Sequence, residues 1–179
     1  AWAMLVGAHA SNNDHEAAET SFYMAQDALA QPSANVLVAM SGSLLTRNLA
    51  ERAIWCAQEA MKLDPEVHGG RLRLAGALVA AGQGQRASQI LLQELREDPG
   101  NVQALLLHAD VLADTGRAGE ALIKLHRVLE LEPANVDAHI RAGEYAMDEQ
   151  RWEEAFIAWG LVRRLQPNHK RACLHLAQT

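Results

Sequence analysis

Histidine and cysteine are the residues most able to bind a metal or act as nucleophiles, and their spacing in this sequence favours neither role. The chain has eight histidines, but no two are four residues apart, the spacing that places two imidazoles on one helix face for a zinc ion. Cys56 and Cys173 are far apart and form no CxxC pair. We therefore expect no metal site, and we expect both cysteines to behave as small apolar side chains.

No catalytic centre is indicated either. Nucleophilic catalysis needs a nucleophile beside a base, and acid–base catalysis needs carboxylates paired in a closed site. The sequence contains no such combination at a suitable spacing. The segment Gly82-Gln83-Gly84-Gln85 is glycine-rich, but it follows helical apolar spacing rather than a strand, so we expect a turn and not a phosphate loop. The sequence predicts a protein that is not an enzyme and uses no cofactor.

The composition is that of a folded helical protein. Apolar residues make up 49% of the chain and charged residues 21%, enough to form a core. The formal net charge of −6 argues against nucleic-acid binding, because a phosphate backbone attracts the opposite sign. No apolar stretch is long enough to insert in a bilayer. Without a visible leader or paired cysteines, a cytoplasmic location is favoured. Because the sequence does not begin with Met, periplasmic and membrane-tethered locations remain alternatives.

The prolines of the chain fall at one phase of a repeat. They are Pro32, Pro65, Pro99, Pro133 and Pro167, with spacings of 33, 34, 34 and 34 residues. Because a proline does not continue a helix, it marks the same point in each repeat, a loop that follows a helix. Asn101 and Asn135 come two residues after a proline and are placed to cap the next helix.

Small residues and turn residues keep the same period. The small residues form pairs twelve residues apart: Ser41 with Ala53, Ala75 with Ala87, Ala109 with Ala121, and Gly143 with Ala155. They allow two helices of one repeat to approach closely. The turn candidates between them are Asn48, Gly82, Gly116 and Gln150. Gly and Asn tolerate the left-handed backbone of a helix end, so Gln150 is the poorest fit.

The apolar residues between these markers have helical spacing. Each repeat is therefore predicted to be a first helix (helix A), a tight turn, a second helix (helix B) and a proline-marked loop. The predicted helices are residues 2–12, 14–31, 35–47, 50–63, 67–81, 84–97, 102–114, 118–131, 136–149, 152–165 and 169 onward. His108 and His139 are expected to be packing or boundary residues on helix faces.

This pattern of small residues, turn residues and prolines resembles the tetratricopeptide repeat over essentially the whole chain. The resemblance implies an all-α fold, a right-handed superhelix (α-solenoid) of about five helix-turn-helix repeats plus a terminal helix. We expect a single domain over residues 1–179, with repeats at about 1–33, 34–67, 68–101, 102–135 and 136–169 and a partial sixth at 170–179. The chain departs from the family in that the late helix-B position is aromatic only at Trp159.

In this family a concave groove lined by the A helices binds the partner. Carried over position by position, the resemblance assigns the groove to Val38, Gly42, Leu45, Leu72, Arg73, Gly76, Leu106, Asp110, Asp114, Asp137, Arg141, Glu144 and Asp148. The earlier residues are largely apolar, and Gly42 and Gly76 are expected to leave space for a side chain of the partner. The later residues are mostly acidic, a pattern that either a basic partner or a solvated helix face would produce.

These residues lead to a functional expectation. The Lys and Asn residues with which some family members clamp a C-terminal carboxylate, and the Asn ladder with which others hold a peptide backbone, are absent from the corresponding positions. We expect a non-catalytic scaffold or adaptor whose protein or peptide partner has apolar and basic character. Two alternatives are a repeat region of a larger protein, possibly fused to an enzyme domain, and a self-assembling oligomer.

Overall fold

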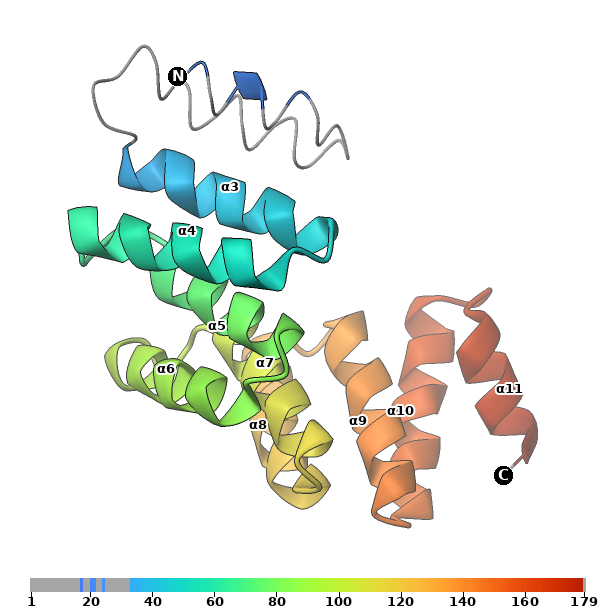
Figure 1. The fold of residues 1–179 in the computed structure, drawn as a ribbon. Helices are drawn as coiled ribbons and strands as arrows, with labels where there is room; N and C mark the ends of the chain where they lie inside the picture. Colours follow the sequence, from blue (N-terminus) through green and yellow to red (C-terminus); the bar gives the residue numbers. More distant parts are fainter. Residues whose placement is uncertain (1–16, 18–19, 22–23, 25–32, 179) are drawn as a thin grey trace. The chain divides into compact units, whose positions relative to one another are not determined.

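A computed structural model describes residues 33–178 and four isolated residues before them, 17, 20, 21 and 24. All regular secondary structure in this part of the chain is helical, as predicted (Figure 1). The helices are α3 (Ala34–Thr46), α4 (Ala50–Leu63), α5 (Gly70–Ala80), α6 (Gly84–Glu97), α7 (Val102–Asp114), α8 (Ala118–Leu131), α9 (Val136–Asp148), α10 (Trp152–Leu165) and α11 (Lys170–Gln178). The predicted helices at 2–12 and 14–31 lie almost entirely outside the described residues. None of the described helices is both long and apolar enough to cross a bilayer.

The turns between the helices of each repeat adopt the predicted conformation. Asn48, Gly82, Gly116 and Gln150 have φ values of 58°, 72°, 74° and 58°. In each turn the following N–H donates to the carbonyl five residues earlier, at 2.8–3.0 Å, which closes the helix end in a Schellman arrangement. Gln150, the residue that fits least well by type, takes the same left-handed conformation as the glycines.

The helix starts are also set locally. The side chains of Asn101 and Asn135 accept hydrogen bonds from the N–H groups of Ala104 and Ala138, so both predicted caps are confirmed. The prediction for α5 was wrong by three residues at its start. Gly69 has a φ of 73°, which is incompatible with a right-handed helix, and α5 therefore begins at Gly70 rather than at residue 67.

The chain divides into two compact units, Ala1–Leu91 (unit 1) and Leu92–Thr179 (unit 2), with the boundary inside α6. In unit 1, α3 packs on α4, and α5 packs on both. The side chains of Leu37, Met40 and Leu44 are almost fully buried. The small pair of this repeat is in direct contact, because the Ser41 hydroxyl donates to the carbonyl of Ala53 at 2.9 Å.

In unit 2, consecutive helices from α7 to α11 pack against one another around one apolar core. The predicted small residues Ala109, Ala121 and Ala155 are buried in it. At Gly143 an added Cβ would lie 2.7 Å from Cε2 and Nε1 of Trp159. The indole ring therefore takes the space that a side chain at residue 143 would need, which explains why glycine stands opposite the aromatic residue of this repeat. His108 and His139 are buried as expected, 3% and 5% exposed.

Candidate partner-binding faces

The predicted groove residues of unit 1 lie on the A helices α3 and α5. Together they form what we call the unit-1 face: Val38, Gly42, Leu45, Leu72, Arg73 and Gly76. All are partly exposed except Arg73, which is exposed. The core of the unit is made by other residues of the same helices, such as Leu37 and Leu78. The A helices thus bury one side and leave these residues in reach of solvent.

Side chains of the unit-1 face lie beside both of its glycines, closely at Gly42 and at an ordinary contact distance at Gly76. A Cβ built on Gly42 would lie 3.3 Å from Cζ and Nη1 of Arg73, and a Cβ on Gly76 would lie 3.7 Å from Cδ1 of Leu45. The guanidinium of Arg73 therefore rests against the α3 backbone. Within the described part of the chain, Arg73 forms no hydrogen bond or ion pair.

The predicted groove residues of unit 2 lie on α7 and α9. They form the unit-2 face: Leu106, Asp110, Asp114, Asp137, Arg141, Glu144 and Asp148. Leu106 is partly buried and packs against the core. The charged residues divide into two groups, those already paired within the chain and those without a partner among the described residues.

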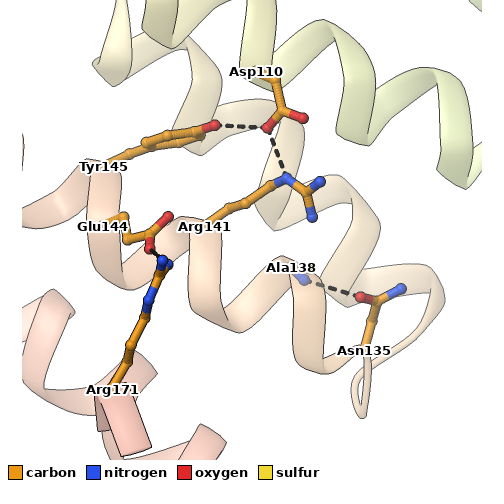
Figure 2. A network of polar contacts seen from close by, with 7 residues as sticks. All are labelled: Asp110, Asn135, Ala138, Arg141, Glu144, Tyr145 and Arg171. Atoms are coloured by element: carbon orange, nitrogen blue, oxygen red, sulfur yellow. Dashed lines mark hydrogen bonds and ion pairs between the residues drawn. The ribbon is translucent and has the colours of Figure 1, made fainter. Parts of the chain in front are cut away.

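Asp110 belongs to the paired group (Figure 2). Its Oδ1 accepts a hydrogen bond from Nε of Arg141 and another from the hydroxyl of Tyr145, each at 2.6 Å. The side chains of Asp110 and Arg141 are 28% and 30% exposed. Arg141 and Tyr145 are four residues apart on α9 and therefore reach across to α7 from the same helix face.

The environment keeps both donors protonated. The pKa of Tyr145 is raised by burial of the phenol and by its hydrogen bond to the Asp110 carboxylate. Burial alone would lower the pKa of Arg141, but the hydrogen bond and the charge of Asp110 outweigh that effect and the pKa is raised. The charge of Asp110 is therefore balanced within the chain by Arg141, and its Oδ1 already accepts two hydrogen bonds.

Glu144 is also paired. It lies one 34-residue period after Asp110, and its carboxylate contacts Nη1 of Arg171 on α11 at 2.8 Å (Figure 2). The two side chains are 37% and 68% exposed, so this pair is closer to solvent than the Asp110 pair. Equivalent acidic residues of successive A helices are thus each held by a cation of the following A helix.

Asp114, Asp137 and Asp148 form the unpaired group. All three are exposed, and within the described residues none forms a hydrogen bond or ion pair. Asp114 and Asp148 are the last residues of α7 and α9, where the helix dipole disfavours a negative charge by roughly 0.3–1 kcal/mol. Asp137 is in the first turn of α9, where the dipole favours it. A cation bound by Asp114 or Asp148 would relieve an unfavourable interaction.

Sequence reasoning selected Asp110, Arg141 and Glu144 but did not show that they are partners of neighbouring helices, and it missed Tyr145. The sequence contained only a weak indication that Tyr145 joins this pair. Tyr145 follows Arg141 by one helical turn, and Asp110 lies at a fixed point of the preceding repeat. Helical spacing can group residues of one helix, but it does not define which residue of the next helix they meet.

The cysteines show no sign of a nucleophilic role. Cys56 is buried, as suits a small apolar side chain, whereas Cys173 is exposed. Burial raises the pKa of the Cys56 thiol to about 11, so it is protonated at neutral pH and a poor nucleophile. It lines a cavity of about 240 Å³ with Met40, Leu44, Arg52 and Trp55. No group of three or more metal-ligating side chains occurs among the residues that the structure describes.

Comparison with known proteins identifies the architecture. No family profile matches the sequence, and no curated protein matches it. Solved structures do. TTC0263, a thermophilic TPR (tetratricopeptide repeat) protein from Thermus thermophilus, aligns with a TM-score of 0.75 and 21% identity, over 92% of this chain and 89% of that one. YrrB, described as a TPR protein with an unusual peptide-binding site, aligns with a TM-score of 0.73 and 21% identity, over 99% of this chain and 91% of that one.

The chain has the tetratricopeptide repeat fold. A structure of MamA is also similar, with a TM-score of 0.74 and 14% identity over 91% of this chain and 95% of that one. In tetratricopeptide terms, α3, α5, α7, α9 and α11 are A helices, and α4, α6, α8 and α10 are B helices. The unit-1 and unit-2 faces therefore each lie on A helices.

Proposed function

We propose that this chain is a non-catalytic tetratricopeptide scaffold that binds a protein or peptide partner on its A-helix faces. The observation that carries the proposal is the unit-1 face, where Val38, Leu45 and Leu72 stay partly exposed while other residues of α3 and α5 form the core. Partly exposed apolar side chains that lie together favour association with another surface. The similar structure of YrrB, a TPR protein with an unusual peptide-binding site, supports a peptide as the occupant.

The chemistry of the partner follows from the side chains that remain unpaired. Asp110 and Glu144 already bind Arg141 and Arg171, so they offer little to a basic ligand. Asp114 and Asp148 are exposed at the ends of their helices. We therefore assign basic groups of a partner to Asp114 and Asp148 in unit 2 and, separately, apolar groups of a partner to the unit-1 face.

The apolar part is tested with a matched pair of substitutions. Leu72→Gln alters the unit-1 face, whereas Leu63→Gln makes the same change on α4, at a side chain that is 49% exposed. Proteins retained by the immobilised wild-type chain from native lysate are identified by mass spectrometry, and the affinity of the most enriched one is then measured after purification. We expect Leu72→Gln to weaken binding and Leu63→Gln to leave it unchanged. Equal affinity for both variants would contradict the proposal.

The basic part is tested with the same purified partner. Asp114→Asn and Asp148→Asn remove the two unpaired charges, and Glu153→Gln on α10 serves as an exposed control. We expect the double substitution to weaken binding and to reduce its dependence on salt, because exposed charges are screened over about 8 Å at physiological ionic strength. An unchanged affinity and salt dependence would remove these aspartates from the site.

A second candidate, self-association, is favoured by α10. Its side chains Trp152, Phe156 and Ile157 are 55%, 52% and 61% exposed, and Trp152 and Phe156 share one helix face. If α10 joins two copies, the sedimentation coefficient should rise with protein concentration, and Phe156→Glu should abolish the rise. A concentration-independent monomer would exclude this candidate.

A further inference from the structure

We propose that Arg73 binds an acidic side chain of the partner, in the role that Asp110 fills internally for Arg141. The inference rests on the proposed function, because it assumes that a partner occupies the unit-1 face. The inference adds the chemical identity of one group on the partner, a carboxylate. The evidence is a comparison of two equivalent places in the repeat, one in each unit.

The two places correspond residue by residue. Two 34-residue periods separate Gly42 from Asp110, and the same interval separates Arg73 from Arg141. The contacts correspond as well. Arg141 donates from Nε to Asp110 at 2.6 Å, and Cζ and Nη1 of Arg73 lie 3.3 Å from a Cβ built on Gly42. In both units, the arginine of one A helix reaches the same position of the preceding A helix.

The difference is the missing carboxylate. Position 42 is glycine, and the counterpart of Tyr145 is Ala77, a buried residue without a hydroxyl. Arg73 is exposed, and it forms no hydrogen bond or ion pair with any residue in the described part of the chain. Its guanidinium carries five N–H donors whose forked geometry fits a carboxylate. Unit 1 thus keeps the cation of the unit-2 pair, with no carboxylate or hydroxyl at residues 42 and 77, the counterparts of Asp110 and Tyr145.

The neighbouring side chains define what the carboxylate should be attached to. Arg73 is the only charged residue of the unit-1 face as defined above, and the same face holds the partly exposed apolar side chains of Val38, Leu45 and Leu72. A partner with one carboxylate between apolar groups complements this arrangement in charge and in polarity. An acidic side chain within a continuing peptide meets this requirement. We do not assign a C-terminal carboxylate. Recognition of a chain end would need a second polar group on the unit-1 face, and the other residues of that face are apolar.

The first test needs no ligand. Gly42→Asp restores a carboxylate at the position of Asp110, and Gly42→Asn is the uncharged control of the same shape. The nearest atoms to the new Cβ belong to the end of the flexible Arg73 side chain, which can shift by a few tenths of an ångström. We expect a higher unfolding temperature for Gly42→Asp than for Gly42→Asn at low salt, with the gap closing at high salt and in the Arg73→Gln background. Equal unfolding temperatures at all salt concentrations would overturn the proposal.

The second test measures recognition. A random peptide library displayed on phage is selected against the full wild-type chain, with Leu72→Gln for counter-selection. We expect the enriched peptides to contain Asp or Glu beside apolar residues. For the best peptide, synthesised with an amidated C-terminus, replacing its acidic residue by the corresponding amide should weaken binding to the wild-type chain about tenfold, or about 1.4 kcal/mol. The same replacement should have no effect on binding to Arg73→Gln or Gly42→Asp.

The outcomes separate the two proposals. Peptides that bind through the unit-1 face but tolerate loss of the acidic residue or of Arg73 would refute the role of Arg73 and leave the scaffold function intact. Peptides that bind only with a free C-terminus would also refute it, in favour of a chain end. A library that enriches nothing over the Leu72→Gln variant would count against both. Circular dichroism of each variant ensures that losses of binding are compared among folded proteins.

Discussion

Replacing Asp110 by alanine tests whether the contacts between α7 and α9 stabilise unit 2. The carboxylate accepts hydrogen bonds from Arg141 and Tyr145, each at 2.6 Å, and the two charged side chains are only 28% and 30% exposed. An exposed ion pair contributes about 0.2–1 kcal/mol, whereas breaking a fully buried pair costs about 3–5 kcal/mol. Because this pair is between these limits, we expect Asp110→Ala to lower the free energy of unfolding by about 1.5–3 kcal/mol.

The assay is urea unfolding of the full chain followed by circular dichroism. Asp114→Ala is the matched control, since Asp114 is on the same helix, is exposed and lies at the disfavoured end of the helix dipole. We expect it to change stability by no more than about 0.5 kcal/mol. A double-mutant cycle of Asp110→Ala with Arg141→Gln should give a coupling free energy of about 1 kcal/mol, within the range for contacting residues.

Equal destabilisation by Asp110→Ala and Asp114→Ala would refute this reasoning. A coupling free energy below about 0.3 kcal/mol would also refute it, because independent sites are additive to within that amount. Salt provides a further check. Because the pair retains some contact with solvent, its coupling should decrease, but not vanish, at 1 M salt, where charges are screened over about 3 Å.

Three further predictions concern packing and protonation. Gly143→Ala should destabilise the chain by about 1–3 kcal/mol, because its Cβ would overlap the buried indole of α10, whereas Gly160→Ala, at an open position of α10, should stabilise it by up to about 1 kcal/mol. Thermal unfolding distinguishes the two, and equal effects would contradict the packing. Burial, together with nearby cations, lowers the pKa of His108. The unfolded state therefore binds the proton more readily, so stability should be complete above the ordinary value of about 6.5 and should fall as the pH drops below it. The decline should be smaller in His108→Gln, as measured by urea unfolding at several pH values, and an unchanged profile would exclude this origin. Finally, Cys173 should react with a thiol reagent at neutral pH much faster than Cys56, whose thiol is buried with a pKa of about 11; comparable rates would contradict this burial.

The repeat itself could be predicted from the sequence because its determinants are local. Prolines end helices, Asn101 and Asn135 cap them, and the turn positions at Gly82 and Gly116 need a left-handed backbone. Each of these effects acts within a few residues, and all recur with a period of about 34. Several helix bounds, such as Ala50–Leu63 and Ala118–Leu131, therefore match the prediction residue for residue.

The start of α5 shows where local reasoning was incomplete. The apolar pattern extends back to Val67, and that residue is buried, but burial is not helix formation. Gly69 adopts a φ of 73°, so the helix cannot extend past it towards the N-terminus. A glycine is compatible with either backbone, so the residue type alone did not determine the φ of Gly69.

The partners of Asp110 and Glu144 were decided by the tertiary structure. The sequence places Asp110 and Glu144 on acidic helix faces, but the packing of successive A helices brings Arg141 and Arg171 to them. The same packing places Arg73 over Gly42, where no carboxylate is present. Helix periodicity determines which residues share a face, because it is a property of one backbone. Which faces meet, and at what register, depends on side-chain packing between residues that are 27 to 35 positions apart in the chain.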